Sequence, residues 1–277
     1  MTFAIETKQL TRDFNDVHAV KSVDLAVRRG SLYGFLGPNG AGKSTTIKML
    51  TGILVPSSGE ITLLGKNPWN RDDAIAIKQQ TGVVPEDLAL FDNLTAREYL
   101  TFTGRMYSMD PATIRQRSEE LLHLLSLDEV EKKLTVEYSH GMKKKLALAA
   151  ALLPNPDLLF LDEPFEGVDA VTSRVIRDLL AIYVRRGSTV FVTSHVLEIV
   201  ERICTHVGII ANGQLVEQAS LDELRQGSSL EQRFLEKVGR PDDEQINLAW
   251  LEDGPIRAEQ PVVSEIASEM TSGESPQ

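Results

Sequence analysis

Short, mostly apolar runs occur in both halves of the chain and alternate with segments of helical spacing. The runs at residues 31–36, 158–161, 189–193 and 207–210 are typical of strands that are buried on both faces. Because predicted helices separate these strands, we expect an α/β fold with a mainly parallel sheet covered on both sides. The helix expected directly after the first run begins at Thr45 and continues through Leu50.

The middle of the chain, at about residues 87–155, is predicted to be an inserted helical subdomain. Thr95 and Glu98 form a capping box that opens a helix through Tyr107. Asp110 followed by proline predicts a second helix, which runs to about Ser126. Its buried side is expected to contain Ile114, Leu121, Leu122 and Leu125. A third, apolar helix is expected at Leu146–Leu153.

These elements predict a single domain over residues 1–239, with its core at about 1–86 and 156–239. A short amphipathic helix near its end is expected to bury Leu230, Phe234, Leu235 and Val238 on one face. Residues 241–277 hold nine acidic residues and one basic residue. We therefore predict that residues 240–277 form an acidic, disordered tail.

Composition and charge limit the possible functions. The chain has 277 residues, of which 42% are hydrophobic, enough for a substantial core. Its longest apolar run, at residues 146–153, is far shorter than the roughly 18 to 20 residues that cross a bilayer, and the N-terminal residues do not resemble a secretory signal. The net charge of −11 disfavours nucleic acid as a partner. The single cysteine, Cys204, is expected to be a buried apolar residue.

A glycine-rich segment between the first of these strands and the helix after it predicts a nucleotide site. Its glycine spacing lets backbone N–H groups surround phosphate oxygens, and the helix that follows directs its positive end at the anion. In this pattern Lys43 reaches the β- and γ-phosphates and Ser44 ligates Mg²⁺. The segment, which indicates ATP or GTP, consists of Gly37, Pro38, Asn39, Gly40, Ala41, Gly42, Lys43, Ser44 and Thr45.

Two acidic residues follow the run at residues 158–161. Asp162 and Glu163 lie at the carboxyl end of that strand, the edge at which α/β sheets bind ligands. We expect Asp162 to hold Mg²⁺ through water and Glu163 to polarise a water that attacks the γ-phosphate in line. Upstream, Ser139 and Gly141 precede the apolar helix and could form an anion site at its N-terminus.

Taken together, these motifs resemble the ATP-binding subunit of ABC transporters over about residues 3–239. Ser139-His140-Gly141 lies where that family carries its Ser-Gly-Gly-Gln signature. Four further matches follow the family's order: Phe14, at the position of an aromatic residue that stacks on adenine; Glu86, in place of the usual glutamine; Asp169, in the loop after the acids; and His195, at the switch histidine.

The resemblance implies a P-loop NTPase core with an antiparallel N-terminal β part, the inserted helical subdomain, and two bound ATP per dimer. Each ATP would lie between Lys43, Ser44, Asp162 and Glu163 of one chain and Ser139 and Gly141 of the other. Glu163 would act as the general base, His195 would hold the γ-phosphate and the water in line, and Glu86 would offer a carboxylate oxygen to Mg²⁺ or water.

The resemblance also implies a partner and a location. A separate transmembrane permease would contact the helical subdomain beside Glu86, and the chain would lie at the cytoplasmic face of the cell membrane. His140 and Glu86 depart from the common pattern in the same way as a prokaryotic subgroup linked mainly to export of drugs, lipids or polymers. Export is therefore the expected direction. Neither the cargo nor the identity of the second ATP-binding subunit follows from the sequence.

Two other functions fit a single cassette less well. A soluble ABC-type ATPase that acts as a switch on ribosomes or DNA usually carries two cassettes or a long coiled coil between cradle and signature. Here Lys43 precedes Ser139 by only 96 residues, and the charge is acidic. A regulatory subunit that binds ATP without turnover also fits less well, because every core catalytic residue is present except at the altered Glu86 position.

Overall fold

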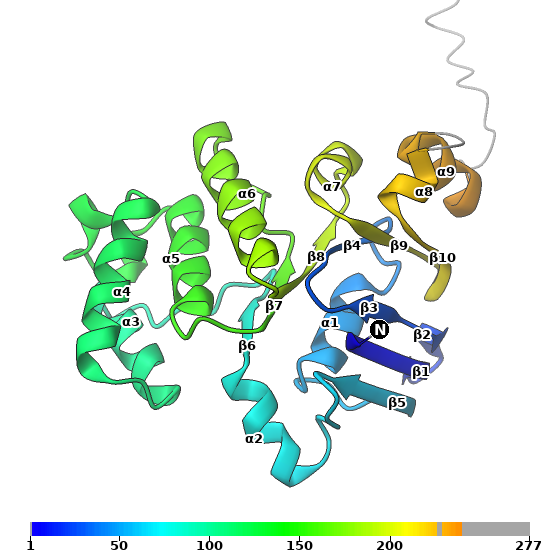
Figure 1. Cartoon of the computed structure of the whole chain (residues 1–277), viewed down its shortest axis with the longest axis horizontal. Helices are drawn as coiled ribbons and strands as arrows, with labels where there is room; N and C mark the ends of the chain where they lie inside the picture. The colour runs from blue at the N-terminus through cyan, green and yellow to red at the C-terminus, as the bar shows by residue number, and fades with distance from the viewer. Residues whose placement is uncertain (1, 226–228, 240–277) are drawn as a thin grey trace, which may run out of the picture. The chain divides into compact units, whose positions relative to one another are not determined.

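The computed structural model describes residues 2–225 and 229–239, which belong to one compact unit. The predicted acidic tail at residues 240–277 lies outside the described residues. Within the unit, Figure 1 shows a sheet in the middle, helices α3, α4 and α5 on one side of it, and a second sheet on the other. No helix of the described part combines the length and apolar character needed to cross a membrane.

The larger sheet has six strands in the order β10-β9-β4-β8-β7-β6. All neighbouring strands run parallel except β9 and β10, which confirms the prediction of a mainly parallel sheet. Strands β4, β7 and β8 are buried along their whole length. The bounds are β4 Leu32–Leu36, β6 Thr81–Val84, β7 Leu158–Asp162, β8 Thr189–Ser194, β9 His206–Ala211 and β10 Gln214–Ser220.

The second sheet is antiparallel and is built around β1, as the family resemblance implied. Strand β1 pairs with β2, β3 and β5. Aromatic rings pack between the two sheets, where Phe191 contacts Tyr33, Phe35 and Phe160. The bounds are β1 Phe3–Phe14, β2 Val17–Val23, β3 Ala26–Arg28 and β5 Ser58–Leu63.

The segment between β6 and β7 is helical. Helix α3 begins after Thr95 with the predicted capping box, and α4 begins after Asp110 with proline in its first turn. Helix α4 ends at Leu124 rather than near Ser126, because the backbone of Ser126 is left-handed, with φ at 54°. The elements are α3 Ala96–Met106, α4 Pro111–Leu124, the short turns Asp128–Val130 and Thr135–Glu137, and α5 His140–Leu152.

Two predicted helices differ from the structure. Helix α5 begins at His140, six residues before the predicted start, because the Ser139 hydroxyl accepts a hydrogen bond from the backbone N–H of Met142 and so caps the helix there. In α9, Leu230 is buried and Phe234 and Val238 pack against the core, whereas Leu235 is exposed. The residues of α9 that face the core, Leu230, Phe234 and Val238, are spaced four apart. Leu235 therefore lies at the edge of this face.

The other helices complete the fold around the two sheets. Helix α6 packs against β8, and α7 packs against β4 and β8. Gly34 of β4 is required where α7 approaches, because a Cβ atom there would lie 2.5 Å from Val200 Cγ1. Cys204 is buried beside it, as predicted. The bounds are α1 Lys43–Leu50, α2 Arg71–Gln79, α6 Ala170–Arg185, α7 Leu197–Ile203, α8 Leu221–Arg225 and α9 Leu230–Val238.

Candidate nucleotide site

The glycine-rich loop connects β4 to α1 and passes close to both sheets. Gly42 has φ at 107°, a left-handed backbone that other residues rarely adopt. A Cβ atom at Gly37 would lie 2.4 Å from the Ile210 carbonyl oxygen, and one at Gly42 would lie 2.6 Å from that of Ala19. Only glycine therefore fits at these two positions.

Lys43, the first residue of α1, is almost fully buried. Its ammonium group donates hydrogen bonds to the carbonyl oxygens of Gly37 and Pro38, at 2.8 and 3.2 Å. The same nitrogen lies 4.0 Å from Glu163 Oε1. The Lys43 ammonium group therefore contacts both the glycine-rich loop and the Glu163 carboxylate. Because it is buried, it can strongly stabilise the negative charge of a phosphate bound at the loop.

Asp162 and Glu163 occupy different environments at the end of β7. The Thr193 hydroxyl of β8 donates to Asp162 Oδ1 and accepts a hydrogen bond from the backbone N–H of Glu163. Burial raises the pKa of Asp162, although the Thr193 and Ser44 hydroxyls oppose that shift. Glu163 has a left-handed backbone with φ at 48°, and its Oε1 lies 3.1 Å from His195 Nδ1.

Ser44, Glu86 and Asp162 provide oxygen atoms that are suited to bind Mg²⁺. The Ser44 hydroxyl donates to Glu86 Oε2 at 3.0 Å, and Asp162 is close enough for Ser44 and Glu86 to influence its pKa. A hydroxyl and two carboxylates fit the preference of Mg²⁺ for oxygen ligands. Within residues 2–225 and 229–239, however, no three His, Cys, Asp or Glu side chains are grouped to hold a metal ion. These residues therefore suit a cation that is also bound by phosphate oxygens.

A cavity of about 360 Å³ lies over the loop. Its volume is near the lower end of the range for small-molecule sites. Most of the residues that line this cavity were predicted from the sequence, whereas Ala19 and Glu166 were not. The lining residues are Ala19, Asn39, Gly40, Gly42, Lys43, Ser44, Thr45, Glu86, Glu163, Glu166 and His195.

Comparison with known proteins identifies the family. A sequence model described as ABC transporter matches residues 20–166. The bacitracin transport ATP-binding protein BcrA of Bacillus licheniformis is 37% identical over 226 residues, which cover 81% of this chain and 72% of that protein. The chain belongs to the ABC transporter family. The daunorubicin/doxorubicin resistance ATP-binding protein DrrA of Streptomyces peucetius is 34% identical, covering 81% of this chain and 67% of that protein.

Further comparisons concern how much of each relative is matched and which solved structures have the same fold. The probable multidrug ABC transporter ATP-binding protein YbhF of Escherichia coli is 35% identical over 88% of this chain, but the match spans only 43% of that protein. A solved ATP-binding subunit of an ABC transporter superposes with a TM-score of 0.79 at 29% identity, covering 85% of this chain and 99% of that one. The predicted α/β class and P-loop NTPase architecture are confirmed by this match.

Five residues that the ABC resemblance assigned to the ATP site do not line the cavity. One of them is Asp162, which is buried at the end of β7. Phe14 is 42% exposed, and the Arg12 guanidinium lies over its ring at 4.5 Å. Ser139 caps α5, and Gly141 lies beside the carbonyl oxygen of Gly167. Asp169 caps α6, and hydrogen bonds from Thr172 lower the pKa of its carboxyl.

Lys144 and Glu166 were missed by sequence reasoning. Glu166 lines the cavity, and Lys144 is 3% exposed beneath the turn that joins Glu163 to Glu166. The sequence holds no signal that distinguishes Lys144 from its neighbours. All residues from Leu146 to Leu152 are buried, so Lys143, Lys144 and Lys145 each precede buried residues at helical spacing.

Proposed function

We propose that this chain is the ATP-hydrolysing subunit of an ABC exporter. The observation that carries the proposal is the position of Glu163, which is held within reach of both Lys43 and His195 at the edge of the loop cavity. This geometry combines a phosphate cradle with a base and a polar group that can orient a water. The names of BcrA, DrrA and YbhF support a role in transport.

Glu163 would supply the general base. Its carboxylate accepts a proton from the attacking water while the water oxygen bonds to the γ-phosphorus and the bond to the bridging oxygen breaks, which leaves ADP and phosphate. His195 holds the water and the γ-phosphate in line, and Lys43 balances charge on the β- and γ-phosphates. Ser44, Asp162 and Glu86 would hold Mg²⁺, which neutralises phosphate charge when bound.

The site would be completed by a second, identical or homologous chain. Ser139 and Gly141 lie outside the cavity of their own chain, so in our proposal they contact ATP held by the loop of a partner. Asp169, at the start of α6, would lie in the same interface, and Phe14 would offer its ring to the adenine. A solved bacterial ABC transporter cassette, MJ0796, at 25% identity and a TM-score of 0.72, is dimeric and supports this arrangement.

We place the proposed contact with a membrane permease in an apolar groove between α2 and the end of α3, rather than on the helical subdomain beside Glu86 as the resemblance implied. This groove has a volume of about 500 Å³ and is lined by Trp69, Ile75, Met106 and Tyr107 among others. Ile75 and Met106 are 64% and 69% exposed and line the same groove, and exposed apolar side chains that cluster mark interaction sites. Docking there would place the chain at the cytoplasmic face of the cell membrane.

The decisive experiment replaces Glu163 with glutamine. Glu163→Gln keeps the shape of the side chain but cannot take a proton, so we expect hydrolysis to fall about 10²- to 10⁴-fold while ATP binding persists. With ATP and Mg²⁺ the variant should accumulate as a dimer in size-exclusion chromatography. Phosphate release close to that of the unmodified protein would exclude Glu163 as the base, and a monomer at saturating ATP would contradict a site shared between two copies of this chain.

A further inference from the structure

Lys144 is a buried cation that takes no part in lining the nucleotide cavity. It lies one turn into α5, between the partly exposed Lys143 and Lys145. Burial lowers its pKa, while Glu166 and Glu163 act in the opposite direction. A charged side chain in such a place is costly unless its donors are used. Its contacts therefore indicate what it does.

Both strong contacts of Lys144 are to the backbone of the turn after the acid pair. The ammonium group donates to the carbonyl oxygens of Glu163 and Glu166, each at 2.7 Å. It also lies 3.7 Å from Glu166 Oε2. The backbone N–H of Glu166 donates to the Glu163 carbonyl at 3.3 Å, so Lys144 binds both ends of a single closed turn.

This turn contains the proposed base in a strained conformation. Glu163 has φ at 48°, which a residue with a Cβ atom adopts only when its surroundings impose it. The Thr193 hydroxyl holds its backbone N–H from β8, and Lys144 holds its carbonyl from α5. Between these two contacts the carboxylate is directed to Lys43 and His195.

The same helix begins with the signature residues. Ser139 caps α5, and Gly167, in the loop after the turn, lies close to His140 and Gly141 at the start of that helix. A Cβ atom at Gly167 would lie 3.1 Å from His140 Cδ2, and one at Gly141 would lie 3.3 Å from the Gly167 carbonyl oxygen. The start of α5, Lys144 and the turn from Glu163 to Gly167 therefore form one packed group.

We propose that Lys144 is a positioning residue that holds Glu163 in its working conformation and connects the base to the signature residues of the same chain. The inference rests on the proposed function, in which the signature residues contact ATP bound by the partner. A shift of α5 caused by one ATP would then reach Glu163 at the other ATP through two hydrogen bonds. Lys144 thereby links the two ATP sites of the dimer.

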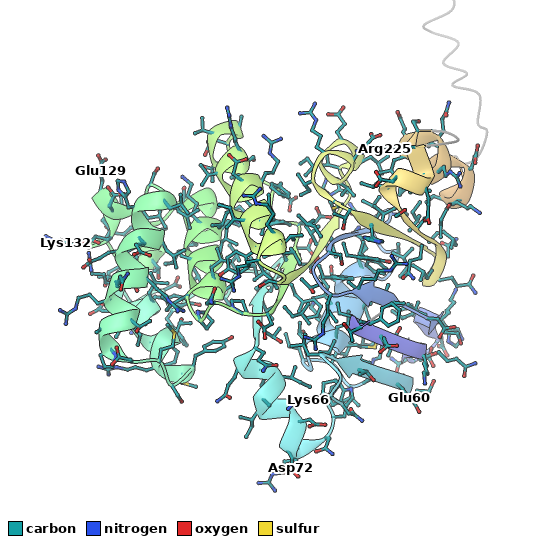
Figure 2. All side chains as sticks on the ribbon, viewed as in Figure 1. Glu60, Lys66, Asp72, Glu129, Lys132 and Arg225 are labelled. Atoms are coloured by element: carbon teal, nitrogen blue, oxygen red, sulfur yellow. The ribbon has the colours of Figure 1, made fainter. Side chains whose placement is uncertain are left out.

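Steady-state kinetics of the full chain test the positioning role. Lys144→Met keeps length and burial but removes the donors, so we expect kcat to fall about 10²-fold, the loss typical of a misplaced catalytic group, with KM for ATP nearly unchanged. At least one of Lys144→Arg and Lys144→Gln, which retain N–H donors, should recover most of the loss. The matched control is Lys132→Met, at an exposed lysine on the outer edge of the helical part (Figure 2).

Two results would overturn the proposal. One is a kcat for Lys144→Met within about twofold of that of the Lys132→Met control. The other is equal loss in all three Lys144 variants while circular dichroism shows them folded, because the donors would then be irrelevant.

A second measurement separates this inference from the proposed function. The double variant Glu163→Gln/Lys144→Met should still dimerise with ATP, since Ser139, Gly141 and the loop are unchanged. If Glu163→Gln alone does not dimerise, the proposed site shared between two copies of this chain fails. If the single variant dimerises and the double variant does not, Lys144 holds the signature residues rather than the base, and the positioning role is refuted.

Discussion

Asp162 and Glu163 are adjacent in the sequence, but their surroundings give them different properties. Asp162 is enclosed at the end of β7, and desolvation raises its pKa. Glu163 is turned toward Lys43 and His195 by its left-handed backbone. A buried carboxylate that is kept for cation binding reduces folding stability. A substitution of Asp162 should therefore raise folding stability and at the same time impair cation binding.

The first prediction concerns Asp162→Asn. Because the folded state raises the pKa of Asp162, ionisation of this group costs stability above the folded pKa and costs nothing below the usual value. At pH 7 the asparagine variant should be more stable by on the order of 1 kcal/mol and should hydrolyse ATP poorly. Denaturant unfolding should show this gain shrinking as the pH falls through the raised pKa of folded Asp162 toward its usual value of 3.8. Glu129→Gln, at an exposed site (Figure 2), is the control, and a loss of stability at pH 7 would contradict the argument.

At the residue scale, the sequence revealed side chains whose role depends on local spacing. The cradle and the acid pair belong to such patterns. Lys144 and Glu166 do not, because their contacts depend on how the turn after β7 meets α5. Three consecutive lysines read as a solvated segment, and the burial of the middle one becomes visible only when the helix is known to begin at His140.

At the scale of elements, helices α3 and α4 pack so closely that Ile114 of α4 leaves no room for a side chain at Gly104 of α3. A Cβ atom at Gly104 would lie 2.5 Å from Ile114 Cγ1. Gly104 is in the last turn of α3, and glycine weakens a helix by up to about 1 kcal/mol relative to alanine. The close packing therefore outweighs helix propensity at this position.

The second prediction is a coupled stability effect at this contact. Gly104→Ala should destabilise the protein by about 1–3 kcal/mol through overpacking, and Ile114→Ala by about 2–5 kcal/mol through the cavity that it leaves. The new methyl group fits into the space that Ile114 vacates, so the double variant should lose about 1 kcal/mol less than the sum. Urea unfolding of the four proteins measures this coupling, and strict additivity would show that the helices separate instead.

Element boundaries show what the sequence could establish. Helices α3 and α4 were found because Thr95 and Asp110 are capping residues in the sequence and also cap the helices in the structure. The start of α5 was placed too late because its cap, Ser139, precedes a polar first turn. The outer face of α9 was misjudged at Leu235, since four apolar residues in nine do not show which of them the core will cover.

At the scale of the whole molecule, the described unit has two surfaces that need other chains in our proposal. The loop cavity is to be completed by the signature residues of a second cassette, and the apolar groove is to be covered by a permease. The two surfaces are built from different residues, since the groove shares no lining residue with the loop cavity. Each surface can therefore be altered without the other.

The third prediction uses this separation. Ile75→Glu combined with Met106→Glu places two charges in the apolar groove, and a buried unpaired charge strongly opposes docking. We expect co-purification with the membrane partner to be lost while ATP-dependent dimerisation continues. Ile182→Glu, at an exposed apolar residue of α6, should keep both. Persistent co-purification of the double variant would place the permease contact on another surface.

The loop glycines have a mechanical consequence for the molecule. Gly37 packs against the backbone of β9 and Gly42 against that of β2. The loop is therefore packed between a strand of each sheet. A packed interior is stiff and cannot yield locally without disturbing both layers. We therefore expect the cradle to keep its position during the proposed catalytic cycle, and displacement to fall on the connections to the helical part, at residues 85–95 and 153–157.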